Sequence, residues 1–108
     1  MGKTVRIDCT QITDWASFHD VFAEAFGFPD FYGRNVDAWI DCMTNLDEEF
    51  STFRVESGEI LTLQLDNAKT LKKNAPELLT DLLEMSAFVN WRRIEVGEPP
   101  VLLVSCYA

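Results

Sequence analysis

Two periods of apolar residues alternate along the first part of the chain. In residues 4–9 every second residue is apolar, which predicts a strand with one buried face. From Thr13 or Asp14 to about Phe26 the apolar residues recur every three or four positions, which predicts a helix with one apolar stripe. Gly27 follows directly and is a typical helix-ending residue.

A loop and a second helix follow in the middle of the chain. Residues 28–33 contain a proline and a glycine among aromatic residues, a composition typical of a loop. Helical spacing of apolar residues returns from Asn35 onward, with Asn35 as the capping residue. Residues 47–58 are polar and acidic, so they are expected to form a loop.

The last part of the chain repeats the alternation of strand and helix. Residues 60–65 alternate as in a strand, and residues 68–73 are expected to form one helical turn. Asn74 is expected to cap a long helix that ends near Trp91. The continuous apolar run at 101–104 predicts a strand that is covered on both faces.

Strands that alternate with helices predict an α/β fold, in which helices pack on a small parallel sheet of three strands to give two layers. The chain has 108 residues, with no repeat, no low-complexity segment and no composition shift that would mark a boundary. Residues 1–108 are therefore expected to form a single domain with one hydrophobic core.

The charge of the chain narrows the choice of partner. Eighteen acidic residues against nine basic ones give a formal net charge of −9. Such a surface repels nucleic acid and anionic membranes, and it attracts basic proteins. The simpler alternative is that the acidic surface serves only solubility.

The cysteines bear on the compartment. Cys9, Cys42 and Cys106 are odd in number, widely spaced and set among apolar neighbours, so they are expected to be buried thiols in a reducing compartment. The chain shows no signal-like apolar segment and no run long enough to span a membrane, so a cytoplasmic location is expected. No metal-ligand cluster and no phosphate-binding glycine loop stand out, so no cofactor is expected.

Two aspartates of the second predicted helix stand out. Asp37 and Asp41 are four residues apart and therefore lie one turn apart on the same helix face. Thr44 lies beside this stripe, and Glu48 would extend it if the helix continued so far. Like charges at this spacing weaken a helix by a few tenths of a kcal/mol. Stability alone therefore does not explain the pair.

The same stretch resembles the signature of the barstar family, an aromatic-rich loop ending in Tyr-Gly and a helix of the pattern Asn-x-Asp-x-x-x-Asp-Cys. The match runs without gaps over residues 29–42. The residues that carry it are Tyr32, Gly33, Asn35, Asp37, Asp41 and Cys42. The predicted order of strands and helices also agrees along most of the chain, whereas the acidic loop is longer than in that family.

The resemblance implies an inhibitor that blocks the active site of a small basic ribonuclease of the secreted type. In that family the loop and second helix enter the active site, where a carboxylate replaces the RNA phosphate and accepts charge-assisted hydrogen bonds. Carried over by position, Asp41 would be the main phosphate mimic and Asp37 a second anionic contact.

Further partner contacts follow from the same resemblance. Phe31 stands where the family often has a tyrosine that packs on the catalytic histidine, and Gly33 lets the loop backbone approach closely. Ile40 occupies the position of an interface tryptophan, and Thr44 lies between the helix acids. Glu84, on the long helix, matches another partner-facing acid.

Other interpretations stay open at this point. The chain could be a barstar-like interaction module that regulates a basic partner other than a ribonuclease, or the aspartates could belong to an ordinary solvated helix face. An enzyme using Asp37 and Asp41 as acid and base is disfavoured, because two carboxylates on one exposed face lack an opposed geometry. His19 falls on the polar side of its helix and is expected to be exposed.

Overall fold

A parallel three-stranded sheet forms one layer of the protein. The computed structural model describes residues 2–47 and 53–108. The strands are β1 (Lys3–Asp8), β2 (Leu61–Asp66) and β3 (Leu102–Cys106), hydrogen-bonded in the order β1-β2-β3 with both pairs parallel. The predicted α/β fold with three parallel strands is confirmed.

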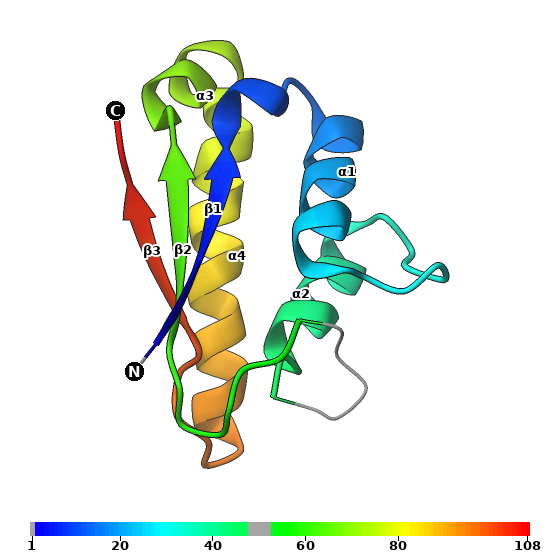
Figure 1. Cartoon of the computed structure of the whole chain (residues 1–108), viewed down its shortest axis with the longest axis vertical. Coiled ribbons are helices and arrows are strands. Elements are labelled where there is room, and N and C mark those ends of the chain that lie inside the picture. Colours follow the sequence, from blue (N-terminus) through cyan, green and yellow to red (C-terminus); the bar gives the residue numbers. More distant parts are fainter. Residues whose placement is uncertain (1, 48–52) are drawn as a thin grey trace.

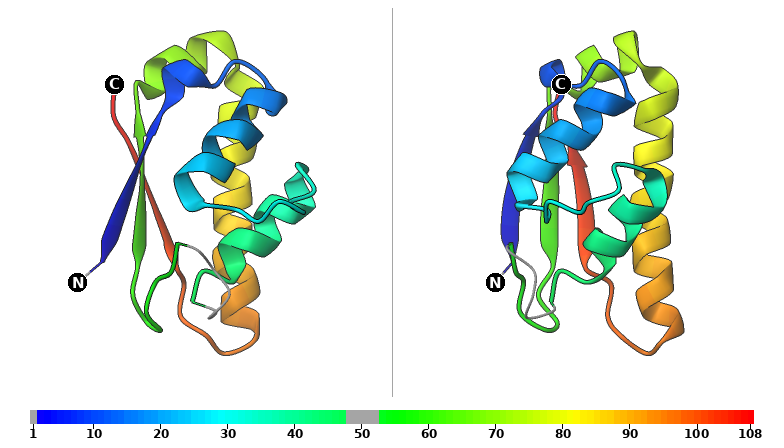
Figure 2. Two further views of the ribbon diagram at one scale, coloured as in Figure 1. Left: turned by 45° about the vertical axis from the view of Figure 1, so that its right-hand side comes forward. Right: turned by 90° about the vertical axis from the view of Figure 1, so that its right-hand side faces the viewer.

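Helices form the second layer. They are α1 (Trp15–Phe26), α2 (Val36–Thr44), α3 (Ala68–Asn74) and α4 (Pro76–Glu95), and a short 3-10 helix, η1 (Cys9–Gln11), follows β1. Figures 1 and 2 show α1, α2 and α4 on the same side of the sheet, with α2 packed beside α4. Among the described residues, no helix covers the other face of the sheet (Figure 2). In the part of the chain that is described, no helix is long and apolar enough to cross a membrane.

Side-chain caps start the first two helices, and a glycine ends the first, at the residues that the sequence predicts. The Asp14 carboxylate accepts a hydrogen bond from the backbone N–H of Ser17 at 2.9 Å, and the Ser17 hydroxyl accepts one from the N–H of Asp14 at 3.0 Å. Gly27 ends α1 in the left-handed conformation, with φ of 62°. The side chain of Asn35 accepts from the N–H of Ala38 at 2.8 Å and so caps α2.

The predicted start of α4 is wrong by one residue. Asn74 is the last residue of α3, and the N–H of Ala75 closes that helix on the carbonyl of Leu71 at 2.7 Å. Ala75 then precedes α4 without a side-chain cap, and Pro76 occupies the first turn as expected. The helix also continues past Trp91 to its end at Glu95.

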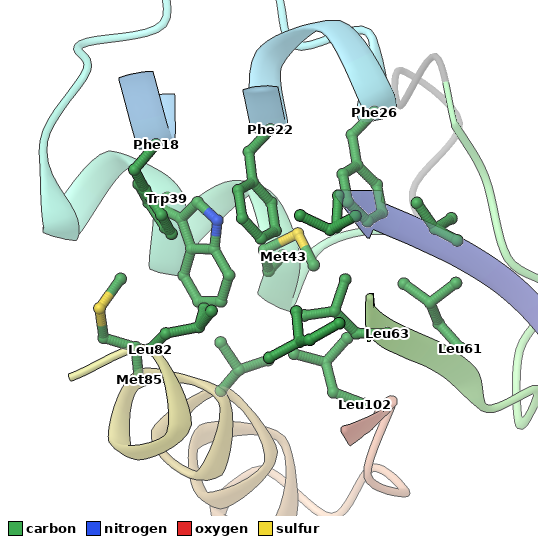
Figure 3. Close-up of a cluster of buried hydrophobic side chains, with 14 of the residues drawn as sticks. Phe18, Phe22, Phe26, Trp39, Met43, Leu61, Leu63, Leu82, Met85 and Leu102 are labelled. Carbon is green, nitrogen blue, oxygen red and sulfur yellow. The ribbon is translucent and has the colours of Figure 1, made fainter. Parts of the chain in front are cut away.

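The core lies between the sheet and the helices (Figure 3). Trp39 of α2 is fully buried, and its ring centroid lies 6.0 Å from that of Phe18 and 5.6 Å from that of Phe22, both on α1. Leu63 of β2 and Leu82 of α4 complete the packing around these rings. The aromatic contacts fix how α2 is rotated, and therefore which of its residues face solvent.

The apolar run of the last strand predicts cover on both faces, and this prediction is wrong. Strand β3 lies at the edge of the sheet, and Leu103 on its outer face is 56% exposed. The helices of residues 2–47 and 53–108 cover the inner face of the sheet alone, so none of them packs on the outer side chains of β3 (Figure 2). The expectation that all three cysteines are buried is wrong for Cys106, which is exposed because it is the last residue of the edge strand β3. Cys9 is buried and Cys42 is half-buried.

Candidate partner-binding site

The two aspartates of α2 point into solvent. Asp37 and Asp41 are both exposed, whereas Trp39 and Met43 on the opposite side of the helix are fully buried. Asp37 lies in the first turn of α2, where the helix dipole favours a negative charge. The helix ends at Thr44, and the expected extension of the acidic stripe to Glu48 lies outside the described residues. The core thus holds α2 in an orientation that presents both carboxylates on one face.

Asp41 has an ion-pair partner within the protein itself. The Arg92 guanidinium, on α4, donates a hydrogen bond from Nη1 to Oδ1 of Asp41 at 2.9 Å. Both side chains keep access to water, with 63% of Asp41 and 40% of Arg92 exposed. Arg92 lies in the last turn of α4, where a positive charge interacts favourably with the helix dipole. Asp41 and Arg92 are 51 positions apart in the sequence, so no local sequence pattern predicts their contact.

The neighbouring Arg93 is buried and joins the end of α2 to α4. Its guanidinium donates to the carbonyl of Thr44 at 2.8 Å, to the carbonyl of Pro99 at 2.8 Å and to both carboxylate oxygens of Asp47 at 3.1 Å each. Glu98 adds an ion pair at 3.2 Å. The hydrogen bond from Arg93 lowers the pKa of Asp47. Asp47, expected in the acidic loop, is therefore neutralised within the fold.

The loop before α2 presents one aromatic ring to solvent. Phe31 is 88% exposed, whereas Tyr32 is half-buried and packs on Phe28 with 4.7 Å between ring centroids. Gly33 is exposed, and a Cβ at this position would lie 3.1 Å from the side-chain nitrogen of Asn35. A larger residue at Gly33 would therefore press on the cap that starts α2.

Three other predicted contact residues differ in accessibility. Ile40 is only 8% exposed and belongs to the core, so it has little surface to offer to a partner. Thr44 is half-buried, and its hydroxyl donates to the carbonyl of Ile40 at 2.6 Å. Glu84 is exposed on α4. It precedes Arg92 by eight residues, which is about 12 Å along the helix.

An apolar groove of about 380 Å³ lies beside the acidic face of α2. Asp41 and Phe31 both line it, together with Phe28, Leu46 and Cys42. Burial, and next the Asp41 carboxylate, raise the pKa of the Cys42 thiol, which disfavours a reactive thiolate. Among the described residues no group of three or more histidines, cysteines and acids is arranged to hold a metal ion.

His19 is buried under the loop that precedes α2, although the sequence predicts that it is exposed. Its side chain is 4% exposed, and Nδ1 lies 2.6 Å from the Tyr32 hydroxyl in a hydrogen bond. Tyr32 and the Trp15 and Phe18 rings cover it, because the loop folds back over this side of α1. Burial lowers the pKa of His19. The nearby Arg34 charge lowers this pKa further, and Asp20 opposes the shift.

The buried His19 predicts a loss of stability in mild acid. Because the folded state favours the neutral imidazole, the contribution of His19 is complete above the ordinary histidine pKa of about 6.5 and is lost as the pH falls below it. We expect the free energy of unfolding, measured in urea, to fall between pH 7.5 and pH 5.5. His19 is the single histidine of the chain, so His19→Gln should remove most of this pH dependence. An equal fall in both proteins would contradict the assignment.

Comparison with known proteins identifies one family. The family model described as barstar (barnase inhibitor) matches residues 2–100, which include both aspartates of α2 and Glu84. A search of curated proteins finds no match. The match confirms the resemblance that residues 29–42 carry, and it extends this resemblance from β1 to the end of α4.

Proposed function

Because this chain belongs to the barstar family, we propose that it is an inhibitor that binds and blocks the active site of a small basic ribonuclease, with no catalysis of its own. The observation that carries the proposal is the exposure of Asp37 and Asp41, one turn apart, on a helix whose other side is locked into the core. The proposed inhibitor is one domain of residues 1–108 that acts in the cytoplasm.

Carboxylate mimicry explains why such a pair would suit a ribonuclease. The active site of a ribonuclease gathers cationic donors to hold an RNA phosphate, and a carboxylate accepts hydrogen bonds from the same donors. A carboxylate on a rigid helix loses less conformational entropy on binding than one on a mobile loop. Asp41 is the proposed phosphate mimic, and Asp37 is the second anionic contact.

Neighbouring residues would complete the proposed interface. The exposed Phe31 ring can pack on a partner side chain, and the small Gly33 beside it leaves the loop backbone accessible. Thr44 is the last residue of α2, three positions after Asp41, and Glu84 would contribute a more distant charge from α4. Ile40 would add only its small exposed edge.

A second candidate function follows from two departures at this surface. Phe31 lacks the hydroxyl of the family tyrosine, and Ile40 replaces the interface tryptophan with a smaller, buried side chain. Such changes would suit a different target, so the second candidate is an interaction module that regulates a basic protein other than a ribonuclease.

An inhibition assay separates the two candidates. We expect the protein to abolish RNA cleavage by at least one member of a panel of small, basic, secreted bacterial ribonucleases, at one inhibitor per enzyme. The Asp37→Asn and Asp41→Asn double variant should lose this inhibition, and Glu24→Gln, which removes an exposed acid of α1, should keep it. If no ribonuclease is inhibited while a basic protein of another class binds, the second candidate is favoured.

The charge of the protein predicts fast association that salt slows. A net charge of −9 and a partner of opposite charge attract each other at long range, and salt screens this attraction. We expect the association rate constant with the inhibited ribonuclease, measured by stopped flow, to fall by about tenfold or more between 20 mM and 500 mM salt, with a smaller change in dissociation. An association rate that stays constant over this range would contradict electrostatic steering.

A further inference from the structure

The main proposed contact, Asp41, already holds a cation in the free protein. Arg92 donates to one carboxylate oxygen of Asp41 and leaves the other oxygen without a contact from this guanidinium. Asp37, one turn earlier, takes part in no ion pair among the described residues. A basic partner would therefore meet two different carboxylates, that of Asp37 without an ion pair to the described residues and that of Asp41 already paired with Arg92.

We propose that Arg92 is an internal competitor for Asp41, which a basic partner has to displace, so that Arg92 limits the affinity of the site. This inference rests on the proposed function in one respect, namely that Asp41 receives a cation of the partner. It adds a regulatory residue on α4 to a site built from α2 and its loop.

The exposure of the pair explains why it can exchange. Water screens an ion pair between two partly exposed side chains, so the pair contributes little and opens readily. Arg93 shows the contrast on the same helix turn, because its side chain is only 4% exposed and is held by several hydrogen bonds. Arg92 can move aside, whereas Arg93 cannot.

Arg92 opposes the binding free energy of the complex more strongly as the partner approaches. When the interface excludes water, two cations that share one carboxylate repel each other more strongly than they do in solvent. The Arg92 side chain then has to leave Asp41 and give up its hydrogen bond. Removal of the guanidinium should therefore strengthen binding, even though it breaks an ion pair of the free protein.

A matched pair of variants tests this competition. Arg92→Gln removes the competitor, and Arg6→Gln is the control, because Arg6 forms an ion pair of the same length, 2.9 Å, with Asp66. Arg6 is exposed and stands in β1 between the buried Val5 and Ile7, so its side chain points away from the core. Both variants change the net charge equally. We expect Arg92→Gln to bind the inhibited ribonuclease about fivefold more tightly than Arg6→Gln does. Equal affinities, or weaker binding by Arg92→Gln, would overturn the proposal.

The same pair in an Asp41→Asn background separates competition from general repulsion. If Arg92 acts by occupying the Asp41 carboxylate, most of the gain from Arg92→Gln should vanish when that carboxylate is absent. A gain of the same size in both backgrounds would show that Arg92 merely repels cations, and the proposal would be wrong.

A probe that needs no ribonuclease keeps this test independent of the proposed function. Hexa-arginine supplies guanidinium groups, and its binding can be followed by amide chemical shifts of α2. We expect Arg92→Gln to bind hexa-arginine more tightly than Arg6→Gln does, and this gain should depend on Asp41. If this result holds while no ribonuclease is inhibited, the proposed function fails and the competitor role stands. The opposite pattern, inhibition without any effect of Arg92, overturns the competitor role alone.

Discussion

Replacement of Asp41 with alanine is expected to cause the largest loss of affinity for the ribonuclease, about 2–5 kcal/mol. Truncation of a charged side chain that forms hydrogen bonds within an interface weakens the complex by this amount, partly because the opposing cations are left buried and unpaired. Measurements on the complex of barstar with barnase underlie part of this range, so the magnitude comes from the family rather than from the geometry of α2. Asp37→Ala should cost less, and Glu84→Ala less again.

A control on another helix makes this result specific. Glu24 is an exposed acid on α1, so Glu24→Ala removes the same charge away from α2 and should leave affinity nearly unchanged. Dissociation constants from titration calorimetry, with circular dichroism to verify folding, give the comparison. If folded Asp41→Ala and Glu24→Ala weaken binding equally, α2 is an ordinary solvated helix and the phosphate mimic lies elsewhere.

Features that depend on nearby residues could be predicted from the sequence. The cap at Asn35 is a contact between a side chain and the backbone three residues on, and the ending at Gly27 depends on one residue's access to the left-handed conformation. The exposure of Asp37 and Asp41 follows in the same way, because the helical period places them opposite Trp39. These local rules predict that the two carboxylates lie on the surface, whereas their proposed role in binding comes from the resemblance to the barstar family.

Features that depend on how the elements pack could not be predicted. Nothing near His19 in the sequence shows that a loop folds over it, so its place on the polar side of α1 wrongly suggested exposure. The apolar run of β3 is compatible with a central strand, and only the strand order shows that it is an edge. The same holds for Arg92, whose contact with Asp41 depends on the packing of α4 beside α2.

The second large effect concerns stability and the adjacent arginine. We expect Arg93→Ala to lower the free energy of unfolding by about 3–5 kcal/mol, because removal of one member of a buried ion pair leaves the other charge uncompensated. Asp47, with a side chain only 14% exposed, would lose both hydrogen bonds to the guanidinium, and the Thr44 and Pro99 carbonyls would lose theirs. The end of α2 would then be released from α4.

Arg92→Ala provides the control for this second effect, since it removes the same side chain one position earlier on the same helix. Its ion pair is exposed, so its loss should change the free energy of unfolding by less than about 1 kcal/mol. Urea unfolding of both variants at pH 7 measures the difference, and comparable losses would show that burial of Arg93 does not set its contribution.

The pH dependence of unfolding in acid tests the contribution of the ion pair between Arg93 and Asp47. Because Arg93 lowers the pKa of Asp47 in the folded protein, the carboxylate stabilises the fold above its ordinary pKa of about 3.9, and this stabilisation is lost as the pH falls through the lowered value. In Arg93→Ala this lowering is absent, so that variant should lose less stability between pH 5 and pH 2.5 than the parent protein does. The difference should disappear when Asp47→Asn is added to both proteins. If it persists, another acid, and not the carboxylate held by Arg93, causes the acid sensitivity.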